Sequence, residues 1–193
     1  MKFSHCTIDL ETLDVQPTAV ITSIAVVCFD LAGNRAEYAV NGDLESCFDA
    51  GLSIGPDTLQ WWFKQSKGAI DAMFENPLDL YSALVGVSHF IKTHRKSSFT
   101  CWTHTTFDVP ILSHAARVMD IQLPIHYREH RDIRTLTWLN RHNFQKSEKP
   151  AGFIAHNALH DARRQADYIS KLLISMSKHD IIVVSNEANK ELK

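Results

Sequence analysis

The run from Val20 to Asp30, VITSIAVVCFD, is the feature that most constrains how this chain folds. It is nearly continuous in apolar residues and rich in Val and Ile, which is typical of a strand buried on both faces. Two shorter runs flank it, Phe3–Asp9 before and Arg35–Asn41 after, and Gly33-Asn34 supplies a turn before the second. We therefore expect three strands joined as a meander in a sheet that is covered on both sides.

The rest of the chain alternates between helical and strand patterns. Pro56-Asp57-Thr58 predicts a helix start, with apolar residues at helical spacing as far as Ala69. Leu78–Thr93 has a clear amphipathic period. A strand, a helix, a strand, a short helix and a long helix are then expected over residues 98–103, 109–119, 126–133, 136–141 and 158–177. This order predicts an α/β domain with a mixed sheet.

We expect one domain over residues 1–180, followed by a C-terminal tail over 181–193. The chain has 193 residues, which is the length of one ordinary domain. Ser147–Gly152 contains Pro and Gly among charged residues and is expected to be a lid or substrate loop. It is not a domain boundary, because too few residues follow it to build a second core.

Charge and composition exclude several classes of protein. The chain has 20 Lys and Arg against 22 Asp and Glu. This balance excludes a basic, charge-driven nucleic-acid clamp, but not an enzyme that holds phosphates through metal ions. No stretch approaches the roughly 18 apolar residues of a membrane span and no signal peptide is recognisable, so no membrane partner is expected. Four scattered cysteines without a CxxC motif predict reduced core thiols and a cytoplasmic protein.

Isolated acids stand at the ends of the predicted elements. Asp9 and Glu11 close the first strand and, being two residues apart, point to the same face. Asp108 precedes a helix, and Asp161 lies at the start of the long C-terminal helix, five residues after His156. Any one of these acids alone could be a helix cap or a paired core acid. Four carboxylates drawn together would repel one another unless cations such as Mg²⁺ or Mn²⁺ lie between them.

Two such ions support in-line displacement at phosphorus, and a nearby histidine can take the proton of the attacking water. A zinc site is the alternative, since His156 and His160 are spaced as in metalloproteases. The intervening residues lack the glutamate of HExxH, however, which disfavours this alternative. The acids and His156 together therefore indicate metal-dependent phosphoryl chemistry.

Asp9-x-Glu11, Phe107-Asp108 and His156-x4-Asp161 resemble the three motifs of the DEDDh branch of the DnaQ-like 3′–5′ exonucleases. Further stretches are similar to the bacteriophage exonuclease A (DexA) group, which is related to the ribonuclease AS domain. They are Trp61-Trp62 with Gln65-Ser66, then residues 107–112, 131–135 and 152–156. The resemblance extends from about Thr7 to Asp167. It implies a ribonuclease H-like fold, a five-stranded mixed sheet flanked by helices.

The resemblance also implies roles for individual residues. Two Mg²⁺ or Mn²⁺ ions would be held by four ligands, Asp9, Glu11, Asp108 and Asp161, with His156 as the general base. Thr12 and Leu13 would hold the terminal nucleotide. The residue types themselves suggest further substrate contacts, by base stacking or by hydrogen bonds to bases and phosphates, for Trp61, Trp62, Gln65, Phe107, Arg131 and Arg134.

The expected reaction is removal of nucleoside 5′-monophosphates from a 3′ end. Single-stranded DNA is expected over RNA because no residue pattern reads the 2′-hydroxyl, and a 3′–5′ exoribonuclease is the alternative. A nucleic-acid-binding module without catalysis is a second alternative, from a different class. We further expect a phage-encoded protein and a homodimer.

Overall fold

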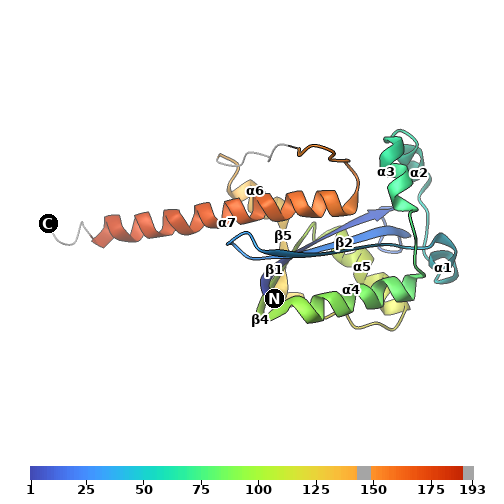
Figure 1. Cartoon of the computed structure of the whole chain (residues 1–193), viewed down its shortest axis with the longest axis horizontal. Helices are drawn as coiled ribbons and strands as arrows, with labels where there is room; N and C mark the ends of the chain where they lie inside the picture. Colours follow the sequence, from blue (N-terminus) through green and yellow to red (C-terminus); the bar gives the residue numbers. More distant parts are fainter. Residues whose placement is uncertain (143–148, 189–193) are drawn as a thin grey trace.

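The computed structural model describes residues 1–142 and 149–188, and its centre is a five-stranded sheet in the order β3-β2-β1-β4-β5 (Figure 1). The strands are β1 Phe3–Thr12, β2 Ile21–Phe29, β3 Arg35–Asn41, β4 Arg95–Thr103 and β5 His130–Asp132. Strands β1 to β3 form the expected antiparallel meander, whereas β4 and β5 run parallel to β1. The expected α/β fold with a mixed five-stranded sheet is confirmed. All nine residues of β2 are buried, as its apolar composition predicts.

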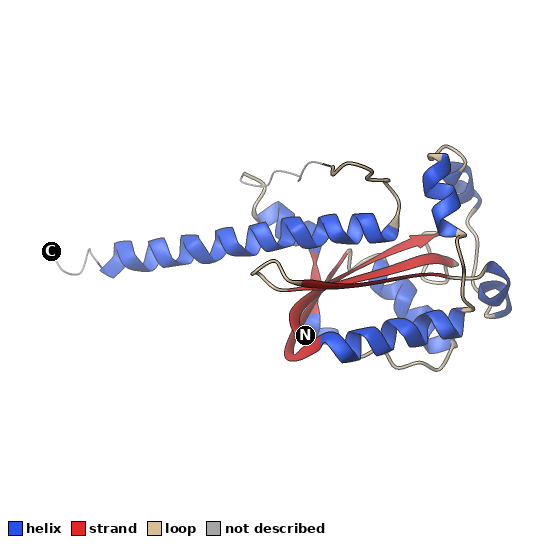
Figure 2. Ribbon diagram, in the orientation of Figure 1, coloured by secondary structure: helices blue, strands red, loops and turns tan. Residues whose placement is uncertain are grey.

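Helices cover both faces of this sheet (Figure 2). They are α1 Leu44–Asp49, α2 Pro56–Trp62, α3 Lys67–Met73, α4 Leu80–His94, α5 Asp108–Val118, α6 Ile133–Leu139 and α7 Ala158–Ala188, with a 3-10 turn over Tyr127–Glu129. Helices α4 and α5 lie on one face, and α6 and α7 lie on the other (Figure 2). Since β1 is enclosed between two paired strands and two helical layers, side chains at its end are held rigidly.

The structure differs from the sequence-based expectation at several element boundaries. The helical pattern from Pro56 to Ala69 is divided, because Ser66 accepts a hydrogen bond from the Ala69 amide and starts α3 as a new helix. The strand expected over 126–133 is reduced to the three residues of β5, and α6 begins at Ile133 rather than Leu136. Helix α1 is not apparent from the sequence pattern.

The C-terminal part of the chain forms one long helix. Helix α7 passes position 180, where we expected the tail to begin, and continues to Ala188. Residues 189–193 of that tail lie outside the described residues. So do residues 147 and 148 of the expected Ser147–Gly152 loop, and the described part from Lys149 to Gly152 is not helical or extended.

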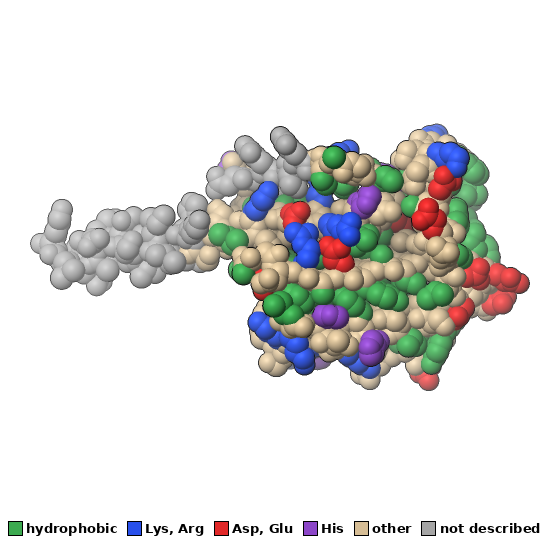
Figure 3. All heavy atoms as spheres, in the orientation of Figure 1, with side chains coloured by type: hydrophobic (Ala, Val, Ile, Leu, Met, Phe, Trp, Pro, Cys, Tyr) green, Lys and Arg blue, Asp and Glu red, His purple; other side chains and the backbone are tan. Residues whose placement is uncertain are grey.

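Ion pairs connect the first half of α7 to the edge strand β3. Arg163 donates to Glu37 at 2.6 and 2.8 Å, and Arg35 donates to Asp167 at 2.9 Å. Figure 3 shows positive and negative side chains intermixed on this face. Exposed pairs of this kind contribute little to stability individually, so they serve mainly to orient α7 on the sheet.

All four cysteines are buried free thiols, as predicted. Within the described ranges, no helix combines the length and apolar character that crossing a membrane requires.

Candidate active site

The predicted acids meet in one pocket at the carboxyl ends of β1 and β4. Because these strands are parallel, their carboxyl ends lie at the same edge of the sheet. Asp9 and Glu11 project from β1, Asp108 begins the helix that follows β4, and Asp161 lies in the first turn of α7. The pocket has a volume of about 690 Å³. Its walls include all four acids, His156, both tryptophans of α2, Phe107 and Arg134.

Hydrogen bonds from neighbouring groups orient the carboxylates. The His104 amide donates to Asp108 Oδ2 at 2.7 Å, and the His156 amide donates to Asp161 Oδ2 at 2.8 Å. Gln165 donates from Nε2 to Asp9 Oδ1 at 2.6 Å. A neighbouring main-chain amide thus orients Asp108 and Asp161, and a side chain of α7 orients Asp9, which is how ligand carboxylates are usually fixed.

Burial raises the pKa of three of the clustered acids, and repulsion by neighbouring acids adds to this effect at Asp9 and Glu11. Asp9, Glu11 and Asp108 are 8%, 8% and 2% exposed. Burial, and then the charges of Asp161 and Asp108, raise the pKa of Glu11 to about 8. Burial raises the pKa of Asp108 to about 7 and that of Asp9 well above its usual range, where the three other acids add repulsion. Such a cluster binds cations favourably, because bound cations remove the repulsion.

His156 lines this pocket, where its backbone conformation and two aromatic rings position its side chain. It lies just before α7 with φ +61°, a conformation that is uncommon for a residue other than glycine and that concentrates at functional sites. Its ring packs edge-on against Trp61 at 4.7 Å and Trp62 at 6.2 Å between centroids. Ligand atoms of His156, Glu11 and Asp161 all lie within 4.8 Å of one another. The imidazole is thus beside the carboxylates.

The adjacent tryptophans of α2 have different environments. Trp62 is 3% exposed and donates from Nε1 to the Thr12 carbonyl at 2.8 Å, which connects α2 to the end of β1. Trp61 is 41% exposed at the wall of the pocket. Adjacent helical residues cannot share one face, so one ring packs inside and the other can contact a ligand.

Three expected substrate contacts are not part of this pocket. Leu13 is buried in the core, its amide donates to Val20 and its carbonyl accepts from Gly55. Gln65 donates to the Trp61 carbonyl at 3.0 Å. Arg131 projects from the exposed edge strand β5 and donates to two main-chain carbonyls at 2.7 Å. None of the three residues lines the pocket, and their contacts with substrate stay predictions.

Thr12, Trp61, Trp62, Phe107 and Arg134 do line the pocket, although Phe107 also packs against the core. The sequence analysis missed Gln165 and His104, which line the pocket as well. Gln165 lies one helical turn after Asp161, so its i, i+4 spacing was a usable signal for a residue on the same face. Thr7 donates to the Gln165 Oε1 at 2.6 Å, which fixes the amide that holds Asp9.

A mixed five-stranded sheet with acids from β1, α5 and α7 converging in one pocket defines a ribonuclease H-like domain with an acidic site. Residues 4–173 match the family described as the 3′-5′ exoribonuclease Rv2179c-like domain, and the chain belongs to this family. The expected class, a 3′–5′ exonuclease, is thereby confirmed. The DexA-type and DEDDh groupings stay predictions.

Known proteins also share this fold. The structure of S. pombe Pop2p in its Mg²⁺- and Mn²⁺-bound form is similar, with a TM-score of 0.55 and 14% sequence identity. The similarity covers 88% of this chain and 82% of Pop2p. At this identity the likeness establishes the fold alone. No curated protein sequence matches the chain.

Proposed function

We propose that this domain is a metal-dependent 3′–5′ exoribonuclease that releases nucleoside 5′-monophosphates from RNA 3′ ends. The observation that carries the proposal is the convergence of four carboxylates and His156 in one pocket. The family description favours RNA, so the proposal takes the exoribonuclease alternative in place of the DNA preference that we expected from the sequence.

The donor set suits two divalent cations. Asp9, Glu11, Asp108 and Asp161 would hold them, because hard carboxylate oxygens are the ligands that Mg²⁺ and Mn²⁺ prefer. When bound, the ions would lower the pKa of the attacking water, so that it ionises more readily to hydroxide, and would stabilise negative charge on the leaving oxygen. The raised pKa values of Glu11 and Asp108 fit this assignment, since a cation would restore the ionised carboxylates.

The remaining residues of the pocket position the RNA and move a proton. His156 accepts the proton of the attacking water, as its place beside Glu11 and Asp161 allows. The exposed ring of Trp61 stacks on the terminal base, and Arg134 contacts a phosphate of the strand. His156 is thus the base of a DEDDh-type site.

The test uses 5′-labelled single strands of RNA and DNA with the same sequence, each with Mg²⁺, Mn²⁺ or EDTA. We expect a metal-dependent ladder that shortens from the 3′ end, faster on RNA. Asp108→Asn keeps the size of the side chain and should abolish the ladder. Faster degradation of DNA would restore the DNA alternative, and turnover in EDTA would refute the metal assignment.

Two expectations stay predictions. The homodimer is tested by sedimentation of the purified chain, and the location in the bacterial or phage-infected host cytoplasm by fractionation.

A further inference from the structure

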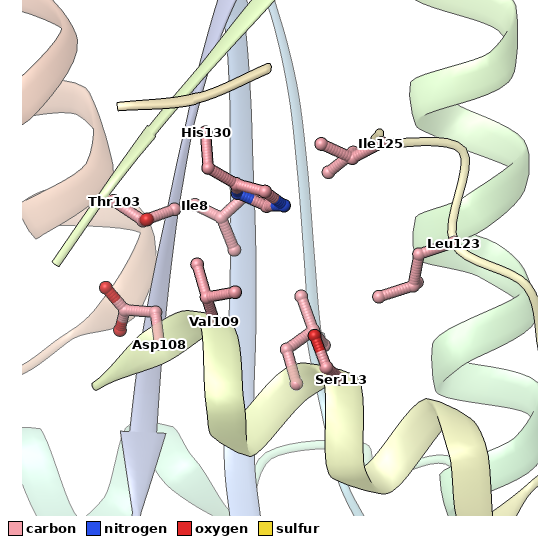
Figure 4. Close-up of a pocket in the computed structure, with 9 residues that line it drawn as sticks. Ile8, Thr103, Asp108, Val109, Ser113, Leu123, Ile125 and His130 are labelled. Atoms are coloured by element: carbon pink, nitrogen blue, oxygen red, sulfur yellow. The ribbon is translucent and has the colours of Figure 1, made fainter. Parts of the chain in front are cut away.

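A second, much smaller cavity lies behind Asp108. It has a volume of about 50 Å³ and lies between the end of β4, helix α5 and the segment that leads to β5 (Figure 4). Most of its lining is apolar and comes from Ile8, Val109, Leu112, Leu123 and Ile125. The polar side chains that reach it are Thr103, Asp108, Ser113 and His130. The cavity is therefore an apolar hollow with a polar end beside a proposed metal ligand.

Two polar atoms at this cavity have no partner. Thr103 Oγ1 and His130 Nδ1 are buried and make no hydrogen bond within the described part of the chain. A buried polar atom without a partner destabilises the fold, because it has lost its hydrogen bond to water. Both residues line the same cavity, so a single guest there could satisfy both atoms.

Water is the guest that fits this cavity. A buried water needs roughly 10–15 Å³ and two to four polar partners. The cavity volume of about 50 Å³ exceeds that need. In Figure 4 the Thr103 hydroxyl lies between the Asp108 carboxylate and the His130 ring, whereas Ser113 lies apart from these three groups.

We propose that ordered water in this cavity joins Thr103 and His130 to the Asp108 carboxylate. Thr103 and His130 are then positioning residues, which orient the metal ligand Asp108 through water-mediated hydrogen bonds. The His104 amide already fixes Asp108 Oδ2 from the main chain, at 2.7 Å. The water restrains the same carboxylate through side chains of β4 and β5. This inference rests on the proposed function, because it takes Asp108 as a ligand.

The first test compares Thr103→Val, which removes the hydroxyl, with Thr103→Ser, which keeps it. Mn²⁺ affinity is measured by calorimetry without RNA, on folded protein of matched thermal stability. Substitution of a residue that hydrogen-bonds to a metal ligand typically weakens metal binding by about 10- to 100-fold. We therefore expect Thr103→Val to bind Mn²⁺ roughly 10-fold more weakly. Thr103→Ser should bind as the wild type does. Equal affinity of all three proteins would overturn the positioning role.

The second test is independent of any variant. A high-resolution crystal structure of the wild-type protein should show water within hydrogen-bond distance of both Thr103 Oγ1 and His130 Nδ1. A dry cavity would overturn the inference even if Thr103→Val does not fold. If the wild type binds Mn²⁺ but Thr103→Val binds it equally well, only this inference fails. If the wild type binds no Mn²⁺, the proposed function fails and this inference with it.

Discussion

Replacing Glu11 by Gln should stabilise the metal-free protein while it abolishes catalysis. The pKa of Glu11 is raised from 4.5 to about 8, first by burial and then by Asp161 and Asp108. A group whose pKa is raised on folding contributes stability below its unfolded pKa and loses it as the pH rises through its folded pKa. The metal-free fold should therefore weaken between about pH 4.5 and pH 8.

The size of this effect follows from the pKa shift. One pKa unit corresponds to about 1.4 kcal/mol, so keeping Glu11 protonated in the fold should cost the metal-free protein about 3 kcal/mol of stability near pH 7. Glu11→Gln removes the charge but keeps the shape of the side chain. We expect the variant to gain stability of that order near pH 7 and little near pH 5.

Urea unfolding in EDTA at about pH 5 and about pH 8 measures this difference. The matched control is Glu45→Gln, which changes an exposed acid in the first turn of α1 and should leave the pH dependence as in the wild type. Added Mg²⁺ should stabilise the wild type more at the higher pH. The reasoning is refuted if the metal-free wild type does not weaken with rising pH, or if Glu11→Gln weakens as steeply.

Three further changes address catalysis and binding. His156→Ala should lower the cleavage rate about 10²- to 10⁴-fold near neutral pH with RNA affinity retained, and an unchanged single-turnover rate would exclude it as the base. Trp61→Ala should weaken single-stranded RNA binding by about 1–3 kcal/mol in fluorescence titrations, whereas Phe63→Ala, 74% exposed and outside the pocket, should not. Gln165→Leu should weaken Mn²⁺ binding about 10-fold because Asp9 loses its donor, and calorimetry showing wild-type affinity would contradict that role.

The fold could be predicted where one physical effect dominates. The Val20–Asp30 run has no polar face, so it can only be a strand inside a covered sheet, and β2 occupies it. The break between α2 and α3 was not predictable from apolar spacing. It is set by the Ser66 side chain, which accepts a hydrogen bond from the Ala69 amide and caps a new helix instead of continuing the first. Helix and strand content were therefore easier to predict than their ends.

The candidate site shows the same limit at the level of single side chains. The four acids could be predicted because a carboxylate within an apolar segment is costly to bury, so its presence there indicates a functional role. The packing of Leu13 could not be predicted from strand alternation, because the pairing of β1 with β2 shifts between Glu11 and Thr12. Leu13 consequently packs in the same core cluster as Leu10. A one-residue irregularity of this kind reverses which side a residue faces, and periodicity does not reveal it.

Under the proposed roles, the position of β1 between two hydrogen-bonded neighbours separates the metal ligands Asp9 and Glu11 from the residues that contact substrate. Asp9 and Glu11 belong to a strand that cannot be lengthened, shortened or shifted without disrupting β2 and β4. Trp61 and Arg134, by contrast, come from the short peripheral helices α2 and α6. Substitutions that change the preference for a 3′-terminal nucleotide should therefore accumulate in those helices, while Asp9 and Glu11 stay unchanged. Engineering a different substrate range should begin at the periphery and leave the central strand untouched.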